Sequence, residues 1–291
     1  MAYAQVLNVT GGATLLFEAT RTGVPSWNTF AAEGKMQFRL LRAHVPATPF
    51  VDLAQWHASG RRSHSQEGHG LRVETDEITS DMPFDGIELR AEGVNFNLLA
   101  FSSPARSSPS LPYARNAMIL DVPRRSQYVV EGERGWCSPT SLAMLHAYHG
   151  IDVSVEETAG AVFDLAYNGT GNWSFNVAFS GSLGLRGAVV HLENLDHAQR
   201  FIERNVPLAI SYSWSGNELP GAPLEHSDGH LAVLTGFTAN GDCAMNDPAA
   251  PDVGVVYPRS AVERIWQRGG GVAYAVAPAA IDYVSLLDGP P

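Results

Sequence analysis

The stretch that decides the fold reads GWCSPTSLAMLHAY and spans residues 135–148. Ser138 and Thr140 suit a helix start, and Pro139 suits its first turn, where a missing N–H is no loss. Apolar residues then recur at helical spacing. The pattern predicts that Cys137 lies at or just before a helix N-terminus, where unpaired N–H groups and the helix dipole lower the pKa of a thiol. By itself the stretch fits two interpretations equally well: a reactive thiolate, or a buried cysteine that contributes only to packing.

The composition is typical of a well-packed globular protein. The chain has 291 residues, 45% hydrophobic and 17% charged, enough for one large domain or two ordinary ones. A net charge of −11 argues against a general nucleic-acid binder, which usually has a basic face. The two cysteines, Cys137 and Cys243, do not make a disulfide framework. A single disulfide bond between them stays an open alternative, and it would leave Cys137 without a free thiol. Cys243 lies in an apolar run and is predicted to be a core residue.

The sequence gives no sign of a targeting or membrane segment. Its first residues, MAYAQV, have neither the basic region nor the apolar core of a secretory signal, and no run of about 18 apolar residues occurs. We therefore expect no membrane span. The cytoplasm is the default location, and secretion stays open if a leader has been removed.

Residues 1–103 alternate between short extended runs and turn signals, and no long helical pattern competes. Runs such as 71–75 and 86–91 alternate polar and apolar residues, as half-buried strands do. The pattern predicts a β-sandwich-like accessory domain. Such a domain could contact a glycan or a protein partner, and nothing in the sequence shows which. In this region His57, His64 and His69, which are of metal-ligating type, lie near Asp52 and Glu67. Without tight ligand spacing, we interpret them as polar loop residues rather than a metal site.

The pattern changes after residues 104–117, a Ser/Pro-rich segment that is predicted to be a linker. In the second domain, residues 118–291, helices are predicted after Cys137 and near 155–167, 175–183, 196–205 and 259–267. Strands are predicted near 208–212, 230–237, 243–246, 253–257 and 272–276. Helices first and antiparallel strands after them indicate an α+β domain.

A cysteine nucleophile needs a base, and the base needs an orienting group. His230 begins an apolar strand, and Asn240-Gly241 predicts a hairpin that brings the start of this strand beside Asn246-Asp247 at the end of its partner. Either Asp247 or Asn246 would then fix the imidazole tautomer. Alone, His230 is better interpreted as structural. Paired with a helix-start cysteine, it favours catalysis.

Two further groups of residues bear on the chemistry. Gln127 lies ten residues before Cys137, and its amide suits an oxyanion donor beside the Cys137 N–H, although a surface glutamine is the alternative. His226, Asp228 and His230 alternate, as metal ligands on one strand face do. The turn signal at Asp228-Gly229 breaks the strand there, which argues against a metal site. The chemistry of a cysteine nucleophile requires neither a metal nor a cofactor, so we expect none.

These pieces resemble the papain-like cysteine peptidases, in the branch similar to the bacteriocin-processing (double-glycine leader) peptidases. The matching pieces are Ser126-Gln127, Trp136 to Ser141, Gly229-His230-Leu231 and Asn246-Asp247-Pro248, and further pieces resemble one subgroup of that branch. The likeness covers roughly residues 119–277 and, less specifically, the β-rich front half. The resemblance implies an α+β papain-like domain preceded by the all-β one.

The resemblance also implies the roles of individual residues. Cys137 would be the nucleophile, His230 the general base and acid, Asp247 the orienting residue and Gln127 the oxyanion donor. The residues implied to line the substrate cleft are Trp136, Ser138, Trp173 and Gly229, with a core position as the alternative for Trp173. Family members often have Gly where this chain has Ser138, which would narrow the cleft.

The expected function is a cysteine-dependent hydrolase that cleaves a peptide or other amide bond through an acyl-enzyme on Cys137. Acyl transfer to an amine uses the same residues and stays open. A second alternative is a binding module, in which the β-rich domain recognises a glycan or protein and the second domain is a degenerate scaffold. The presence of all four residues, Gln127, Cys137, His230 and Asp247, argues against degeneracy.

Overall fold

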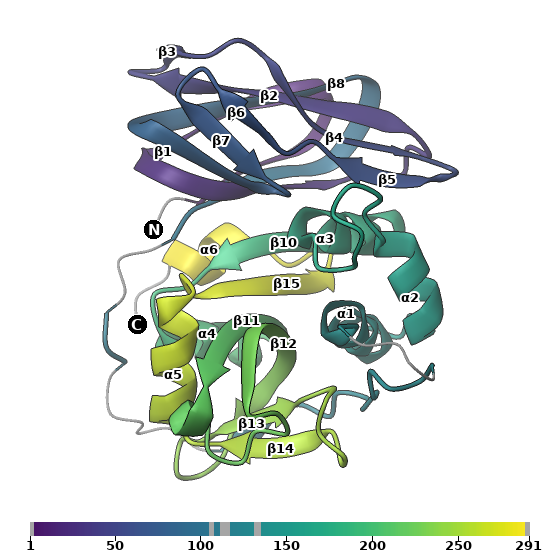
Figure 1. Ribbon diagram of the computed structural model, residues 1–291, viewed down its shortest axis with the longest axis vertical. Coiled ribbons are helices and arrows are strands. Elements are labelled where there is room, and N and C mark those ends of the chain that lie inside the picture. The colour runs from purple at the N-terminus through teal and green to yellow at the C-terminus, as the bar shows by residue number, and fades with distance from the viewer. Residues whose placement is uncertain (1–2, 105–107, 111–116, 131–134, 289–291) are drawn as a thin grey trace. The chain divides into compact units, whose positions relative to one another are not determined.

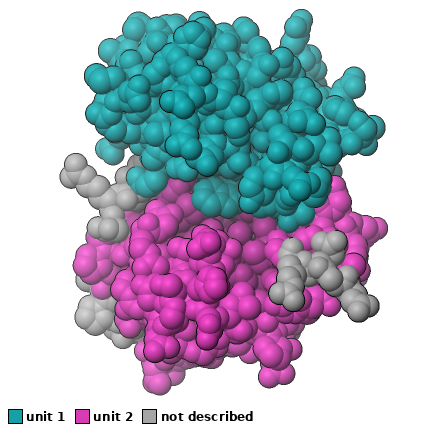
Figure 2. Space-filling view, in the orientation of Figure 1, with its two compact units in different colours: residues 1–104, 161–189 teal, residues 105–160, 190–291 magenta. Residues whose placement is uncertain are grey.

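The computed structural model describes residues 3–104, 108–110, 117–130 and 135–288 (Figure 1). The chain forms two compact units, coloured separately in Figure 2. Unit 1 comprises residues 1–104 and 161–189, and unit 2 comprises residues 105–160 and 190–291.

The two units are not contiguous in sequence, because residues 161–189 pack with the N-terminal strands. The predicted division into residues 1–103, 104–117 and 118–291 stays a prediction.

The described residues 3–102 of unit 1 contain strands and turns and no helix. The strands are β1 (Tyr3–Asn28), β2 (Gly34–Arg42), β3 (Val45–Pro46), β4 (Val51–His57), β5 (Gly60–Ser63), β6 (Gln66–Gly68), β7 (Leu71–Glu74) and β8 (Glu77–Ser102). They form one eight-stranded sheet in the order β5-β4-β2-β8-β7-β6, with β1 paired to β8 and β3 to β2. The high β content predicted for this region is confirmed.

The long strands β1 and β8 make this sheet curl. Residues 98–102 of β8 pair with residues 3–7 on one side and with residues 24–28 on the other. The register shifts along β1 are bulges, which bend and twist a strand. A sandwich would have two separate sheets, whereas hydrogen bonds make this one continuous. The curl encloses a core of fully buried side chains that includes Met36, Phe38, Ile78, Ile87 and Leu99.

Asn28 ties the segment 161–189 to the strands of unit 1. Its buried side-chain amide donates to the carbonyls of Val177 (3.2 Å) and Gly187 (2.9 Å), and its Oδ1 accepts the N–H of Gly187 (3.0 Å). A second anchor is Asp76, whose carboxylate accepts the N–H of Ser174 (2.8 Å) in the first turn of α3 (Trp173–Ser182). These buried bonds satisfy backbone groups of α3 and of the strand after it.

Gly181 permits the close approach of α3 to Asn28. A Cβ at position 181 would lie 2.4 Å from the Cβ of Asn28 and 2.7 Å from its Cα, so backbone has to move. We expect Gly181→Ala to lower the free energy of unfolding by about 2–4 kcal/mol, measured by urea denaturation. Gly160→Ala is the matched control, because a Cβ in that part of α2 (Val155–Val162) meets nothing within 4 Å. It should be neutral or slightly stabilising, and equal stability of the two variants would contradict the contact.

Unit 2 combines helices with an antiparallel sheet. Its helices are α1 (Cys137–Tyr148), α2, whose last two residues lie in unit 1, α4 (Leu195–Glu203), the 3-10 turn η1 (Gly216–Glu218), α5 (Arg259–Arg268) and α6 (Tyr283–Asp288). Its strands are β9 (Met118–Ile119), β11 (Leu208–Ser215), β12 (His226–Phe237), β13 (Cys243–Asn246), β14 (Gly254–Tyr257) and β15 (Val272–Pro278).

The second sheet has the strand order β10-β15-β11-β12-β13-β14, with β9 beside β12. The chain passes from unit 1 to unit 2 within β10 (Leu185–His191), which the sequence pattern did not predict. The helix predicted near 155–167 ends at Val162, and the other predicted helices and strands are present within a few residues. In the described ranges, no helix has the length and apolar character needed to cross a membrane.

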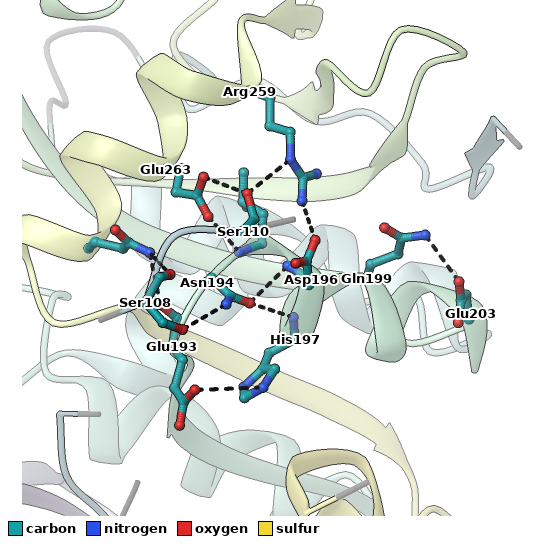
Figure 3. Close-up of polar contacts among 12 residues, drawn as sticks. Ser108, Ser110, Glu193, Asn194, Asp196, His197, Gln199, Glu203, Arg259 and Glu263 are labelled. Atoms are coloured by element: carbon teal, nitrogen blue, oxygen red, sulfur yellow. Dashed lines mark hydrogen bonds and ion pairs between the residues drawn. The ribbon is translucent and has the colours of Figure 1, made fainter. Parts of the chain in front are cut away.

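Residues 108–110, the described interior part of the predicted linker, are held against α4 and α5 (Figure 3). Ser110 donates to the carboxylate of Glu263 in α5 (2.7 Å), and Asn194, the N-cap of α4, donates to the hydroxyl of Ser108 (3.1 Å). Residues 108–110 are therefore part of unit 2 and hydrogen-bonded to its helices. Residues 105–107 and 111–116 of the same segment lie outside the described residues.

Candidate active site

Cys137 is the first residue of α1, as the sequence predicts, and Trp136 is its N-cap. The side chain of Trp136 makes no capping hydrogen bond, so it does not occupy the N–H groups of the first turn. The N–H groups of Ser138, in that turn, and of Leu231, in β12, point to the sulfur instead. The cysteine is 9% exposed, and such donors favour the thiolate over the thiol.

His230 and Asp247 meet through the β12–β13 hairpin. The connection spans residues 238–242, and Gly241 adopts the positive φ of +85° that its turn requires. His230 Nε2 donates to Asp247 Oδ1 over 2.8 Å, and both side chains are buried. Asn246, the alternative partner in the sequence, instead donates to the carbonyl of Val122 (2.9 Å). Asp247, and not Asn246, is therefore the hydrogen-bond partner of the imidazole.

The Cys137 thiol and the same imidazole interact, since each shifts the pKa of the other. Since Nε2 is taken by Asp247, Nδ1 is the ring nitrogen left for the sulfur. Burial raises the pKa of Cys137, but His230 and the backbone N–H groups of Leu231 and Ser138 together lower that pKa below the ordinary value. Burial alone lowers the pKa of His230, and the bonds to Asp247 and Cys137 raise it instead. The arrangement favours a thiolate beside an imidazolium.

The second cysteine has the opposite environment. Cys243 is completely buried in β13, and burial raises the pKa of its thiol far above the ordinary value. Both cysteines are free, so no disulfide bond blocks the thiol of Cys137. Cys243 is a core residue, as the sequence predicts.

Gln127 is buried, at 6% exposure, in the segment that leads to α1. Its backbone N–H donates to the carbonyl of Pro248 (3.0 Å), the residue after Asp247. Its side-chain Oε1 is buried and has no hydrogen-bond partner among the described residues. The alternative interpretation of a surface glutamine is therefore wrong.

The profile of the family described as "Peptidase_C39 like family" matches residues 119–274, more than half of the chain. This chain belongs to the C39-like peptidase family. The match runs through residues 161–189, so this C39-like protein places part of its family-matching sequence in unit 1.

Two solved structures are similar to this C39-like protein. One is a protein from Bacillus anthracis described as a C39-like peptidase, at 18% identity and a TM-score of 0.45, covering 56% of this chain and 98% of its own. The other is a double glycine motif protease from an AMS/PCAT transporter in complex with the leader peptide, at 18% identity and a TM-score of 0.39, covering 57% and 99%. Among curated proteins, none matched the sequence.

The predicted cleft residues have different surroundings. Trp136 is half-buried at the start of α1, and Gly229 is exposed directly before His230. Ser138 is only 1% exposed, and its hydroxyl is hydrogen-bonded to that of Tyr274 (2.9 Å), so its contact with substrate stays a prediction. Trp173 begins α3 in unit 1, and its contact with substrate stays a prediction.

The turn signal at Asp228-Gly229 does not end the strand. Tyr212 pairs with His230 and Trp214 with Ser227, so two residues of β12 oppose one of β11 and form a bulge. His226 and Asp228 are exposed, whereas His230 is buried. Among the residues that the structure describes, no group of three or more His, Cys, Asp or Glu is placed to hold a metal ion.

Three aromatic residues beside the pair His230–Asp247 were missed from the sequence. The rings of Tyr212 and Trp214 lie edge-on to that of His230, with centroids 5.8 and 5.5 Å away. Their alternation on one strand was a usable signal, because residues two apart share a face. The third is Tyr257, which bonds Asp247 through its hydroxyl and could be found only from the register of β13 and β14.

Proposed function

We propose that this C39-like protein is a cysteine peptidase that hydrolyses a peptide bond through a thioester on Cys137. Membership of a peptidase family supports the reaction class. The observation that carries the proposal is the buried bond between the imidazole of His230 and the Asp247 carboxylate (2.8 Å), with the Cys137 thiol near enough to the same imidazole for His230 to lower its pKa. This order of groups is what an activated thiol nucleophile needs.

In the first half of the reaction, the Cys137 thiolate attacks the carbonyl carbon of the substrate. The carbonyl electron pair moves to oxygen, and the oxyanion accepts hydrogen bonds from the Gln127 side-chain amide and the Cys137 N–H. The imidazolium of His230 gives its Nδ1 proton to the leaving amine as the C–N bond breaks. The products of this half are the amine and a thioester on Cys137.

In the second half, His230 takes a proton from water at Nδ1 as the water oxygen attacks the thioester carbon. The C–S bond breaks, the carboxylic acid leaves, and the thiolate–imidazolium pair returns. Asp247 stays ionised throughout and holds the imidazole by its Nε2–H.

Digestion of a peptide library in water enriched in ¹⁸O tests this function. We expect new C-termini that each carry one ¹⁸O atom, because the oxygen comes from the water that resolves the thioester. The same digest with a primary amine added distinguishes acyl transfer. Amine conjugates as the main product, or the absence of any cleavage across the library, would contradict a peptide hydrolase.

A further inference from the structure

The Asp247 carboxylate is bonded at both of its oxygens. Oδ1 accepts His230 Nε2–H (2.8 Å) and the N–H of Ala249 (3.0 Å), and Oδ2 accepts the hydroxyl of Tyr257 (2.8 Å). Tyr257 is fully buried at the end of β14, where it pairs with Cys243 of β13. The hydroxyl is the one side-chain partner of Oδ2 among the described residues.

A carboxylate buried this deeply needs such donors. Removing an ionised carboxylate from water is costly, and hydrogen bonds to its oxygens offset that cost and favour the charged form. Burial alone raises the pKa of Asp247, and His230, Tyr257 and the Ala249 N–H together bring it below the ordinary value. A donor at Oδ2 also prevents the carboxylate from rotating Oδ1 away from the imidazole.

We propose that Tyr257 is a positioning residue for the reaction: its hydroxyl keeps Asp247 ionised and oriented on His230, which extends the chain of acting groups to Cys137–His230–Asp247–Tyr257. This inference rests on the proposed function, and it adds to it a residue that lies outside the sequence pieces of the family resemblance. Tyr257 acts through Asp247 and contacts neither the thiol nor the scissile bond.

The chain offers a matched control in Tyr212. Like Tyr257 it is a buried tyrosine near Asp247, and its ring packs against that of His230. Its hydroxyl, however, has no hydrogen-bond partner among the residues described. The titratable groups that interact with Asp247 are Tyr212 in β11, His230 in β12 and Tyr257 in β14, and Tyr212 in turn interacts with Cys137 in α1 and Cys243 in β13.

The test compares Tyr257→Phe with Tyr212→Phe in the full chain. The rate of iodoacetamide labelling of Cys137 is measured against pH by mass spectrometry. Without the Tyr257 donor, Asp247 takes up its proton at higher pH. The neutral carboxyl no longer stabilises the imidazolium of His230, and the imidazolium in turn no longer stabilises the thiolate of Cys137. We expect the acidic midpoint to rise by about half to one pH unit, so labelling on the acidic limb slows about three- to tenfold. The neutral plateau should stay within about twofold of the wild type.

Tyr212→Phe should leave the midpoint where it is, because no bond is lost. A Tyr257→Phe midpoint equal to that of the wild type, or an equal shift in Tyr212→Phe, would overturn the inference. In the Asp247→Asn background, Tyr257→Phe should add no further shift, since the group through which it acts can no longer ionise.

Two further observations keep the test decisive. If Tyr257→Phe does not fold, 3-fluorotyrosine at position 257 retains the ring and is a stronger donor, and it should move the midpoint to lower pH. A wild-type Cys137 that labels slowly across the acidic range would defeat the proposed function itself. Fast wild-type labelling with no response at position 257 would defeat only the role of Tyr257.

Discussion

Cys137→Ala is expected to reduce the rate of peptide cleavage by about ten-thousand-fold or more. Every covalent step of the proposed reaction uses the sulfur, and removing a nucleophile of this type leaves only the contribution of binding and of the oxyanion donors. The measurement is kcat/KM on a peptide that the wild type cleaves. We expect the variant to fold, because Cys137 is the first residue of α1 and the first turn of this helix depends on the backbone.

Cys243→Ala is the matched control for this result. Cys243 is the other thiol of unit 2, and its burial in β13 makes it unreactive. Its variant should keep kcat/KM within about twofold and lose about 1–2 kcal/mol of stability from the lost packing. Cleavage that persists in Cys137→Ala, or that disappears in Cys243→Ala while the protein is folded, would contradict the assignment of the nucleophile.

His230→Gln is expected to reduce kcat/KM by about a thousandfold or more, with a loss that is largest at mildly acidic pH. Glutamine keeps a polar group beside Asp247 but can neither carry the positive charge nor transfer the proton. Because the charge and hydrogen bond of His230 lower the pKa of Cys137, that pKa should rise toward or above its ordinary value in the variant. The pH profile of kcat/KM reports both effects.

His149→Gln provides the comparison for a histidine of the same unit. His149 follows α1, and its Nε2 is hydrogen-bonded to the carbonyl of Val276 (2.9 Å), a bond that a glutamine amide can replace. We expect its pH profile to match that of the wild type. A His230→Gln profile that also matches would show that the imidazole neither activates the thiol nor protonates the leaving group.

Local sequence signals were sufficient for the parts of the candidate site that depend on one element or one hairpin. The Ser-Pro-Thr run after Cys137 predicts the start of α1, and Asn240-Gly241 predicts the hairpin that brings His230 to Asp247. The first follows from the preference of proline for the first helical turn, since neither Ser138 nor Thr140 caps α1, and the second follows from turn conformation. The choice of Asp247 over Asn246 needed the structure, because both flank the same strand end.

Contacts between distant segments could not be predicted in the same way. Asn28 bonds Gly187 across 159 residues, and no local pattern shows that residues 161–189 pack with the first strands. Likewise, the family resemblance places Ser138 after the cysteine but does not show that its hydroxyl is hydrogen-bonded to Tyr274, 136 residues away. Position along the chain gives the backbone location of a residue and leaves the direction of its side chain open.

The most direct test of the proposed activation of Cys137 by His230 is differential alkylation of the wild-type protein with iodoacetamide at about pH 6. An ordinary thiol, with a pKa near about 8.5, is almost fully protonated there and reacts slowly. We predict fast labelling of Cys137, no labelling of Cys243, and slow labelling of Cys137 in His230→Gln. Slow labelling of both cysteines in the wild type, or fast labelling of Cys137 that does not depend on His230, would contradict a thiolate activated by that imidazole.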